Sequence, residues 1–86
     1  MKVDYDELRR IYRLEKNTSK LVELQEDFYN SLNEFVQEEK TNYLDSLKDL
    51  SNSKAKDFNN LKKMLEEFFS IRQKKLLNQA LIALHT

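Results

Sequence analysis

The chain has 86 residues and contains no glycine, no proline and no cysteine. Glycine and proline make most tight turns, and proline breaks helices, so their absence favours long helices joined by few connectors. The absence of cysteine excludes disulfide bonds and thiolate metal ligands. The sequence therefore predicts an all-α fold with little irregular structure and no redox chemistry.

The length and composition set the size of this fold. A chain of 86 residues has room for one compact unit with a modest core, so we expect a single helical domain over residues 1–86. The 40% hydrophobic content is sufficient for a core, and the 35% charged content is typical of helices with solvated outer faces.

The formal net charge is zero, but the charges are unevenly distributed. Residues 1–20 carry six Lys/Arg and four Asp/Glu, residues 21–50 carry two and eight, and residues 51–86 carry seven and three. The middle of the chain is therefore acidic and both flanks are basic. If these segments are packed helices, this pattern favours a middle helix that lies against the other two.

Helical spacing of apolar residues predicts a short helix followed by a long antiparallel hairpin of two helices. The first helix should cover Asp4 to Lys16, because Asp4 and Glu7 form a variant of the capping box. A polar stretch, residues 17–20, should end it, and Leu21, Val22 and Leu24 should anchor the connector.

The second helix should run from Glu26 to Leu50, and the third from about Lys54 almost to the C-terminus. Residues 51–53 form the predicted turn between them. We expect oligomerisation to complete the helical bundle.

The apolar face of the third helix changes side along its length. On a helical wheel at about 100° per residue, the apolar side chains from Phe58 to Ile71 share one face. Beyond Ile71, Arg72 and Lys75 occupy the same face, and apolar residues appear on the opposite side. The first helix spans only about 20 Å, so it cannot cover both sides of a third helix of about 45 Å.

Burial against another chain is therefore the favoured explanation, and the alternative is a helix end that is packed all round by its own domain. The predicted subunit interface comprises Phe69, Leu76, Leu77, Ala80, Leu81 and Leu84.

Polar groups also fall on the predicted inner faces, where an unpaired charge is costly. Glu15 lies on the stripe of the first helix and Glu39 on that of the second. The hairpin should bring Arg72 near the start of the second helix, so we expect Glu15 or Asp27 to pair with Arg72, together with Lys75. The alternative is that these long side chains extend to water.

The sequence carries no catalytic constellation and predicts neither an enzyme nor a metal or cofactor site. Its one histidine is the penultimate residue, His85, and no cysteine nucleophile exists. A glycine-rich phosphate loop is impossible without glycine. The charged N-terminus and the absence of an apolar run of roughly 18 residues predict an intracellular, cytoplasmic chain without membrane binding.

Direct DNA binding is an alternative with a limited basis. Two groups of basic residues share outer helix faces and could hold phosphates, although solvated faces look the same. They are Arg9, Arg10 and Arg13 in the first helix, and Lys62, Lys63 and Lys74 in the third. The zero net charge and the lack of aromatic residues between them argue for weak binding at most.

Two motifs resemble the helical domain of GINS subunits, especially archaeal members in which this domain comes first. One is Leu21-Val22-Glu23-Leu24-Gln25-Glu26-Asp27-Phe28-Tyr29, and the other runs from Phe68 to Leu76 and includes Arg72 and Lys75. The resemblance extends across nearly the whole chain. Gln25 stands where many relatives carry proline, a mild change because both residues are tolerated at the first helical position.

The resemblance implies a non-enzymatic DNA-replication subunit of a scaffold that joins the MCM helicase at the fork, in the nucleoid. Its partners would be other GINS-type subunits, in a homo-oligomer or hetero-oligomer, and MCM. Leu21, Leu24, Asp27, Phe28 and Tyr29 would organise the domain, and Arg72 and Lys75 would belong to the final-helix motif. Such relatives continue into a small β-rich domain, which this sequence lacks. The rival interpretation is an unrelated helical adaptor or coiled-coil protein that self-associates.

Overall fold

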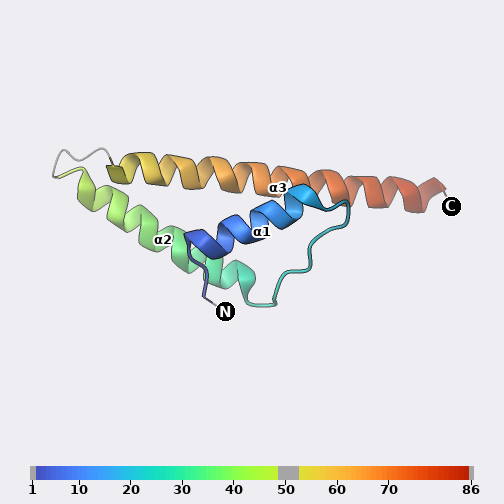
Figure 1. Cartoon of the computed structure of the whole chain (residues 1–86), viewed down its shortest axis with the longest axis horizontal. Helices are drawn as coiled ribbons and strands as arrows, with labels where there is room; N and C mark the ends of the chain where they lie inside the picture. Colours follow the sequence, from blue (N-terminus) through green and yellow to red (C-terminus); the bar gives the residue numbers. More distant parts are fainter. Residues whose placement is uncertain (1, 49–52, 86) are drawn as a thin grey trace.

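The computed structural model describes residues 2–48 and 53–85, and this part of the chain is all-α. It contains three helices, α1 (Tyr5–Asn17), α2 (Phe28–Ser46) and α3 (Ser53–His85). Figure 1 shows α3 as one long rod, with α1 and α2 beside its first two thirds. The predicted fold class is confirmed.

The start of α1 is fixed by the predicted cap. The Asp4 side chain accepts a hydrogen bond of 2.8 Å from the Glu7 backbone N–H, which satisfies one of the free donors at the helix start. The other half of the predicted capping box is replaced, because the Glu7 carboxylate accepts from the Arg10 guanidinium. At the other end, the Thr18 N–H donates to the Leu14 carbonyl at 3.1 Å and closes the last turn.

The second helix is shorter than predicted at both ends. It begins at Phe28, with Asp27 as its N-cap, and it ends at Ser46, whose hydroxyl donates to the Tyr43 carbonyl at 2.7 Å. The predicted end at Leu50 and the predicted turn residues 51 and 52 lie outside the described residues. Because α3 begins at Ser53, the predicted start of the third helix is confirmed to within one residue.

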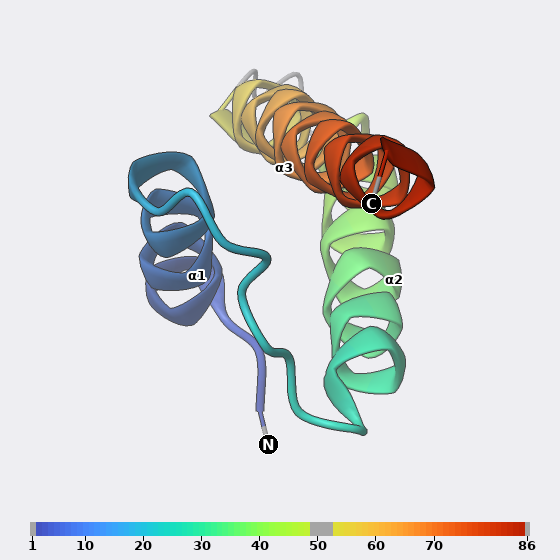
Figure 2. The ribbon, with the colours of Figure 1, turned by 90° about the vertical axis from the view of Figure 1, so that its right-hand side faces the viewer.

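The central element is α3, since both α1 and α2 pack along it. Figure 2 shows α1 and α2 on separate sides beneath α3, with the N-terminal segment and the connector running between them. As predicted, the acidic middle helix contacts both others, since α2 packs along α3 and meets α1 through Tyr5 and Phe35, but the central position belongs to α3. Apolar burial decides the packing: Leu61 and Phe68 of α3 are fully buried, whereas charge pairs between solvated faces contribute little.

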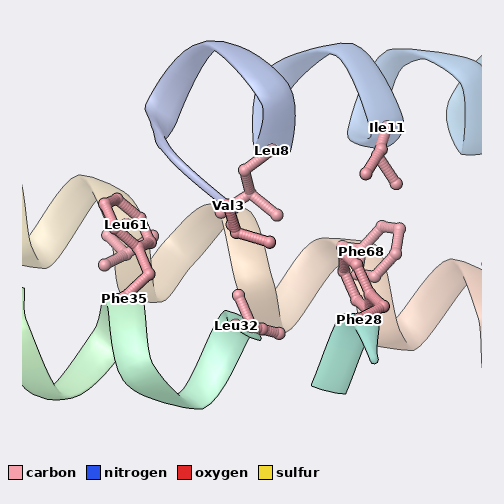
Figure 3. Packing of buried hydrophobic residues seen from close by; sticks show 8 residues of the cluster. All are labelled: Val3, Leu8, Ile11, Phe28, Leu32, Phe35, Leu61 and Phe68. Carbon is pink, nitrogen blue, oxygen red and sulfur yellow. The ribbon is translucent and has the colours of Figure 1, made fainter. Parts of the chain in front are cut away.

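One apolar cluster joins the three helices and the N-terminal segment. Figure 3 shows Val3 between Leu8 of α1 and Leu32 of α2, in the space that the two helices leave beneath α3. The rings of Phe28 and Phe68, both fully buried, lie 6.1 Å apart and connect α2 to α3. The buried apolar residues are Val3, Leu8, Ile11, Phe28, Leu32, Phe35, Leu61 and Phe68.

Tyr5 connects all three helices at the other end of the core. Its ring meets Phe35 of α2 edge-on at 5.1 Å, and its hydroxyl lies 3.3 Å from the Glu39 carboxylate and 3.2 Å from the Asp57 carbonyl. Burial, together with the negative charge of Glu39, raises the pKa of Tyr5 to about 12. Glu39 was predicted to face inward, and its carboxylate accepts a hydrogen bond from the Tyr5 hydroxyl there.

The molecule is elongated because α3 is much longer than the helices that cover it. Its extents are 58 × 23 × 18 Å, and its radius of gyration is 15.8 Å, compared with roughly 12 Å for a compact chain of this length. Figure 1 shows the C-terminal end of α3 extending past α1 and the connector. Residues 76–85, here called the α3 tip, are all exposed.

Candidate functional site

A buried carboxylate lies where α1, the connector and α3 meet. The Glu15 carboxylate accepts from Arg72 Nη1 at 2.6 Å, from Lys75 Nζ at 2.5 Å and from the Val22 backbone N–H at 3.2 Å. Glu15 has no solvent exposure, and the side chains of Arg72 and Lys75 are only 13% and 12% exposed. We call Glu15, Arg72 and Lys75 the polar cluster.

The same two cations hold the backbone of the connector. Arg72 Nη1 donates to the Val22 carbonyl at 2.8 Å, and Lys75 Nζ donates to the carbonyls of Glu15 at 2.6 Å and Lys20 at 2.8 Å. With the Glu15 carboxylate, the ammonium group of Lys75 thus has three acceptors for its three protons. The polar cluster therefore fixes the course of the connector along α3.

The electrostatics of Glu15 follow from these contacts. Burial alone would raise its pKa, but the hydrogen bonds from Lys75 and Arg72 outweigh burial and hold the pKa below its ordinary value of 4.5. In the part of the chain that the structure describes, no buried side-chain nitrogen or oxygen lacks a hydrogen-bond partner. The charged form of Glu15 is thus fully compensated.

This geometry decides between the alternatives drawn from the sequence. Arg72 pairs with Glu15 rather than with Asp27, and Lys75 joins it, so the predicted pairing is confirmed. The alternative that both cations extend to water is wrong, because both are largely buried. The backbone acceptors of the connector could not be found from the sequence, because helical spacing says nothing about an irregular segment.

The residues of the first motif line the connector and the start of α2. Phe28 is fully buried, whereas Tyr29 is 54% exposed and stacks on Phe69 at 6.3 Å. Leu21 and Leu24 are partly buried. A shallow groove of about 440 Å³ opens here, lined by residues 21–26, Tyr29 and Arg72. The structure therefore brings the two motifs together, although about 50 residues separate them in sequence.

The predicted subunit interface falls into two parts. Phe69 is partly buried against the domain's own core through Tyr29 and Phe68. The other five residues lie on the α3 tip and are exposed: Leu76, Leu77, Ala80, Leu81 and Leu84, with the four leucines 50, 61, 44 and 81% exposed in that order. The sequence interpretation missed Ile82, which is 66% exposed on another side of the tip.

The basic residues are on the surface, and two of those in α1 lie beside carboxylates of their own helix. Arg10 pairs with Glu7 at 2.5 Å, and Arg9 lies 3.8 Å from Asp6. Arg13 is exposed, as are Lys62, Lys63 and Lys74 of α3. These partners reduce the positive potential that α1 presents, and DNA contact by this face stays a prediction.

Residues 2–48 and 53–85 were also searched for metal-binding clusters and for helices that could span a membrane. They contain no group of three or more histidine, cysteine or acidic residues that could hold a metal ion. None of the helices formed by these residues is both long and apolar enough to cross a bilayer. The features that stand out are thus the polar cluster, the groove beside it and the exposed α3 tip.

Comparisons with known proteins were made in three ways. No family model, no curated protein and no solved structure matches this chain.

Proposed function

We propose that this chain is a non-catalytic assembly subunit that binds other protein subunits through the α3 tip. The observation that carries the proposal is the exposure of five large aliphatic side chains on ten consecutive residues of one helix: Leu76, Leu77, Leu81, Ile82 and Leu84. Contiguous apolar surface of this kind on a folded chain marks an interaction site.

The resemblance to GINS subunits suggests which assembly this chain belongs to. We propose a subunit of a GINS-type replication scaffold that joins the MCM helicase at the fork. In support, the two motifs that carry the resemblance meet in space, since Arg72 of the second binds the Val22 carbonyl of the first. The Glu15 carboxylate links them a second time, because it accepts from Arg72 and Lys75 and also from the Val22 backbone N–H.

Co-purification tests this proposal. The full chain is mixed with a purified archaeal MCM helicase and a GINS-type partner subunit, and the complexes are resolved by size-exclusion chromatography. We expect the chain to elute with the partner subunit, and the Leu77→Asp/Leu81→Asp variant to elute alone. The matched control is Lys62→Asp, which places the same carboxylate on an exposed position of α3 outside the tip.

Circular dichroism should show equal helix content in both variants, because all three substituted side chains are exposed. A chain that self-associates but binds neither the partner subunit nor MCM would contradict the replication assignment and favour the unrelated helical adaptor.

A further inference from the structure

The groove beside Arg72 has an apolar lining that its own domain leaves partly uncovered. Its volume is about 440 Å³, within the range of pockets that bind small ligands. Leu21, Val22 and Leu24 of the connector line it and are only partly buried, and the ring of Tyr29, which lines it too, is 54% exposed. An apolar group that enters the groove therefore removes these side chains from water, which favours binding.

The charge of the groove is negative. Arg72 lines it, but the Glu15 carboxylate lies 2.6 Å from Arg72 Nη1 and neutralises this cation. Glu23 and Glu26 also line the groove, and both side chains are exposed. Among residues 2–48 and 53–85, no cation lies within ion-pair distance of either carboxylate. A ligand in the groove therefore meets two negative charges that this part of the chain does not compensate.

The backbone of the connector offers hydrogen bonds to such a ligand. Residues 21–25 form neither helix nor strand. Within the described part of the chain, the backbone N–H and carbonyl groups of Leu21, Glu23 and Leu24 have no hydrogen-bond partner. A second peptide backbone can bind groups of this kind, and main-chain hydrogen bonds supply affinity in several modes of peptide recognition. The groove is therefore better suited to a peptide than to a purely apolar small molecule.

From these properties we propose that the groove is a docking site for a short basic peptide segment of another protein. An apolar anchor side chain of the peptide enters between Leu21, Leu24 and Tyr29. Lysine or arginine side chains on either side of the anchor pair with Glu23 and Glu26, and the sign of these charges disfavours nucleic acids and acidic peptides. The groove and the α3 tip consist of different residues, so this inference goes beyond the proposed function and does not rest on it.

Fluorescence anisotropy with the full chain tests the chemistry of this site. The probe is a short fluorescein-labelled peptide with a Leu-Phe core and Lys-Lys on each side. One control peptide replaces the lysines with glutamates, and the other replaces Leu-Phe with Ala-Ala. We expect the probe to bind with a Kd on the order of 10–100 μM, and each control peptide to bind at least about 10-fold more weakly. No binding of the probe at about 1 mM, or equal binding of either control peptide, would overturn the proposal.

Two variants with the same change in net charge locate the site. Glu23→Gln/Glu26→Gln should weaken binding of the probe by about 5-fold, since each exposed ion pair contributes modestly. The matched control, Glu38→Gln/Glu66→Gln, removes two exposed carboxylates of α2 and α3 outside the groove and should leave the Kd unchanged. Circular dichroism should show equal helix content in both variants. Equal weakening by both would mean that net charge alone attracts the peptide, and would overturn the site.

The Leu77→Asp/Leu81→Asp variant separates the groove from the α3 tip. It should bind the probe as tightly as the native chain does, because neither residue lines the groove. Loss of the probe in this variant would mean that the tip holds the peptide, and would overturn the inference. If the native chain binds the probe but no GINS-type subunit, the groove stands while the proposed function fails. Binding of the subunit without the probe would have the opposite meaning.

Discussion

At the scale of single residues, the main feature is the Glu15 carboxylate, which has no solvent exposure and two cationic partners. A fully buried carboxylate is costly unless charge and hydrogen bonds compensate it, and Glu15 has two cations and a backbone N–H. Arg72 and Lys75 also depend on Glu15, because the connector carbonyls that they bind carry no net charge. Removing the carboxylate therefore leaves two largely buried positive charges without a counter-charge.

We predict that Glu15→Gln lowers the free energy of unfolding by about 3 kcal/mol at pH 7, the cost of breaking a buried ion pair. Urea denaturation followed by circular dichroism measures this loss. The matched control is Glu67→Gln, since the Lys16–Glu67 pair is 3.7 Å long with both side chains about half exposed, and it should cost less than about 1 kcal/mol.

The difference between the native chain and Glu15→Gln should shrink in acid. The pKa of Glu15 is lower in the folded chain than its ordinary value of 4.5, so its stabilising contribution is present above pH 4.5 and is lost as the pH falls through the folded pKa. A difference that stays constant down to pH 2, or a loss at pH 7 no larger than that of Glu67→Gln, would contradict this role.

At the scale of elements, the helices follow local rules that are readable from the sequence. The cap at Asp4 and the end of α1 near residues 17–18 were predicted within one residue, because the interactions that set them span four residues or fewer. The end of α2 was predicted four residues too late. Apolar spacing continues to Leu47, but Leu44 and Leu47 are half exposed, so little burial supports the helix beyond Ser46.

We predict that Asp4→Ala destabilises the domain by about 1 kcal/mol, because the Glu7 N–H loses its acceptor at the start of α1. Thermal unfolding followed at 222 nm checks this value. The control is Asp6→Ala in the same first turn, whose carboxylate is almost fully exposed and should contribute no more than about 0.5 kcal/mol. Equal losses for both variants would show that the cap does not set the start of α1.

At the scale of the whole molecule, α3 has two roles along one uninterrupted helix. From Phe58 to Phe69 its apolar side chains are buried or partly buried against α1 and α2. At Arg72 and Lys75 it binds the connector, and beyond them every residue to His85 is exposed. The packing among the described helices therefore ends before α3 does, and the tip is left exposed.

We predict opposite sensitivities for two apolar residues of this helix. Phe68→Ala should cost about 3–5 kcal/mol, because it opens a cavity beside Phe28 in the core. Ile82→Ala should change stability by less than about 0.5 kcal/mol, since Ile82 is 66% exposed. Chemical denaturation of both variants measures the contrast, and a large loss for Ile82→Ala would mean that the domain itself packs against the tip.

The sequence by itself determined the helical class and the starts of α1 and α3 to within one residue, and it placed Arg72 on an inner face where a carboxylate of α1 or α2 could pair with it. Each of these follows from local hydrogen bonding, from apolar spacing or from the cost of an unpaired charge. The tertiary structure decided that α3 is the central helix, that Glu15 is the carboxylate, and that the connector carbonyls complete the polar cluster. Those outcomes depend on contacts between segments 50 to 60 residues apart, whose geometry no local rule encodes.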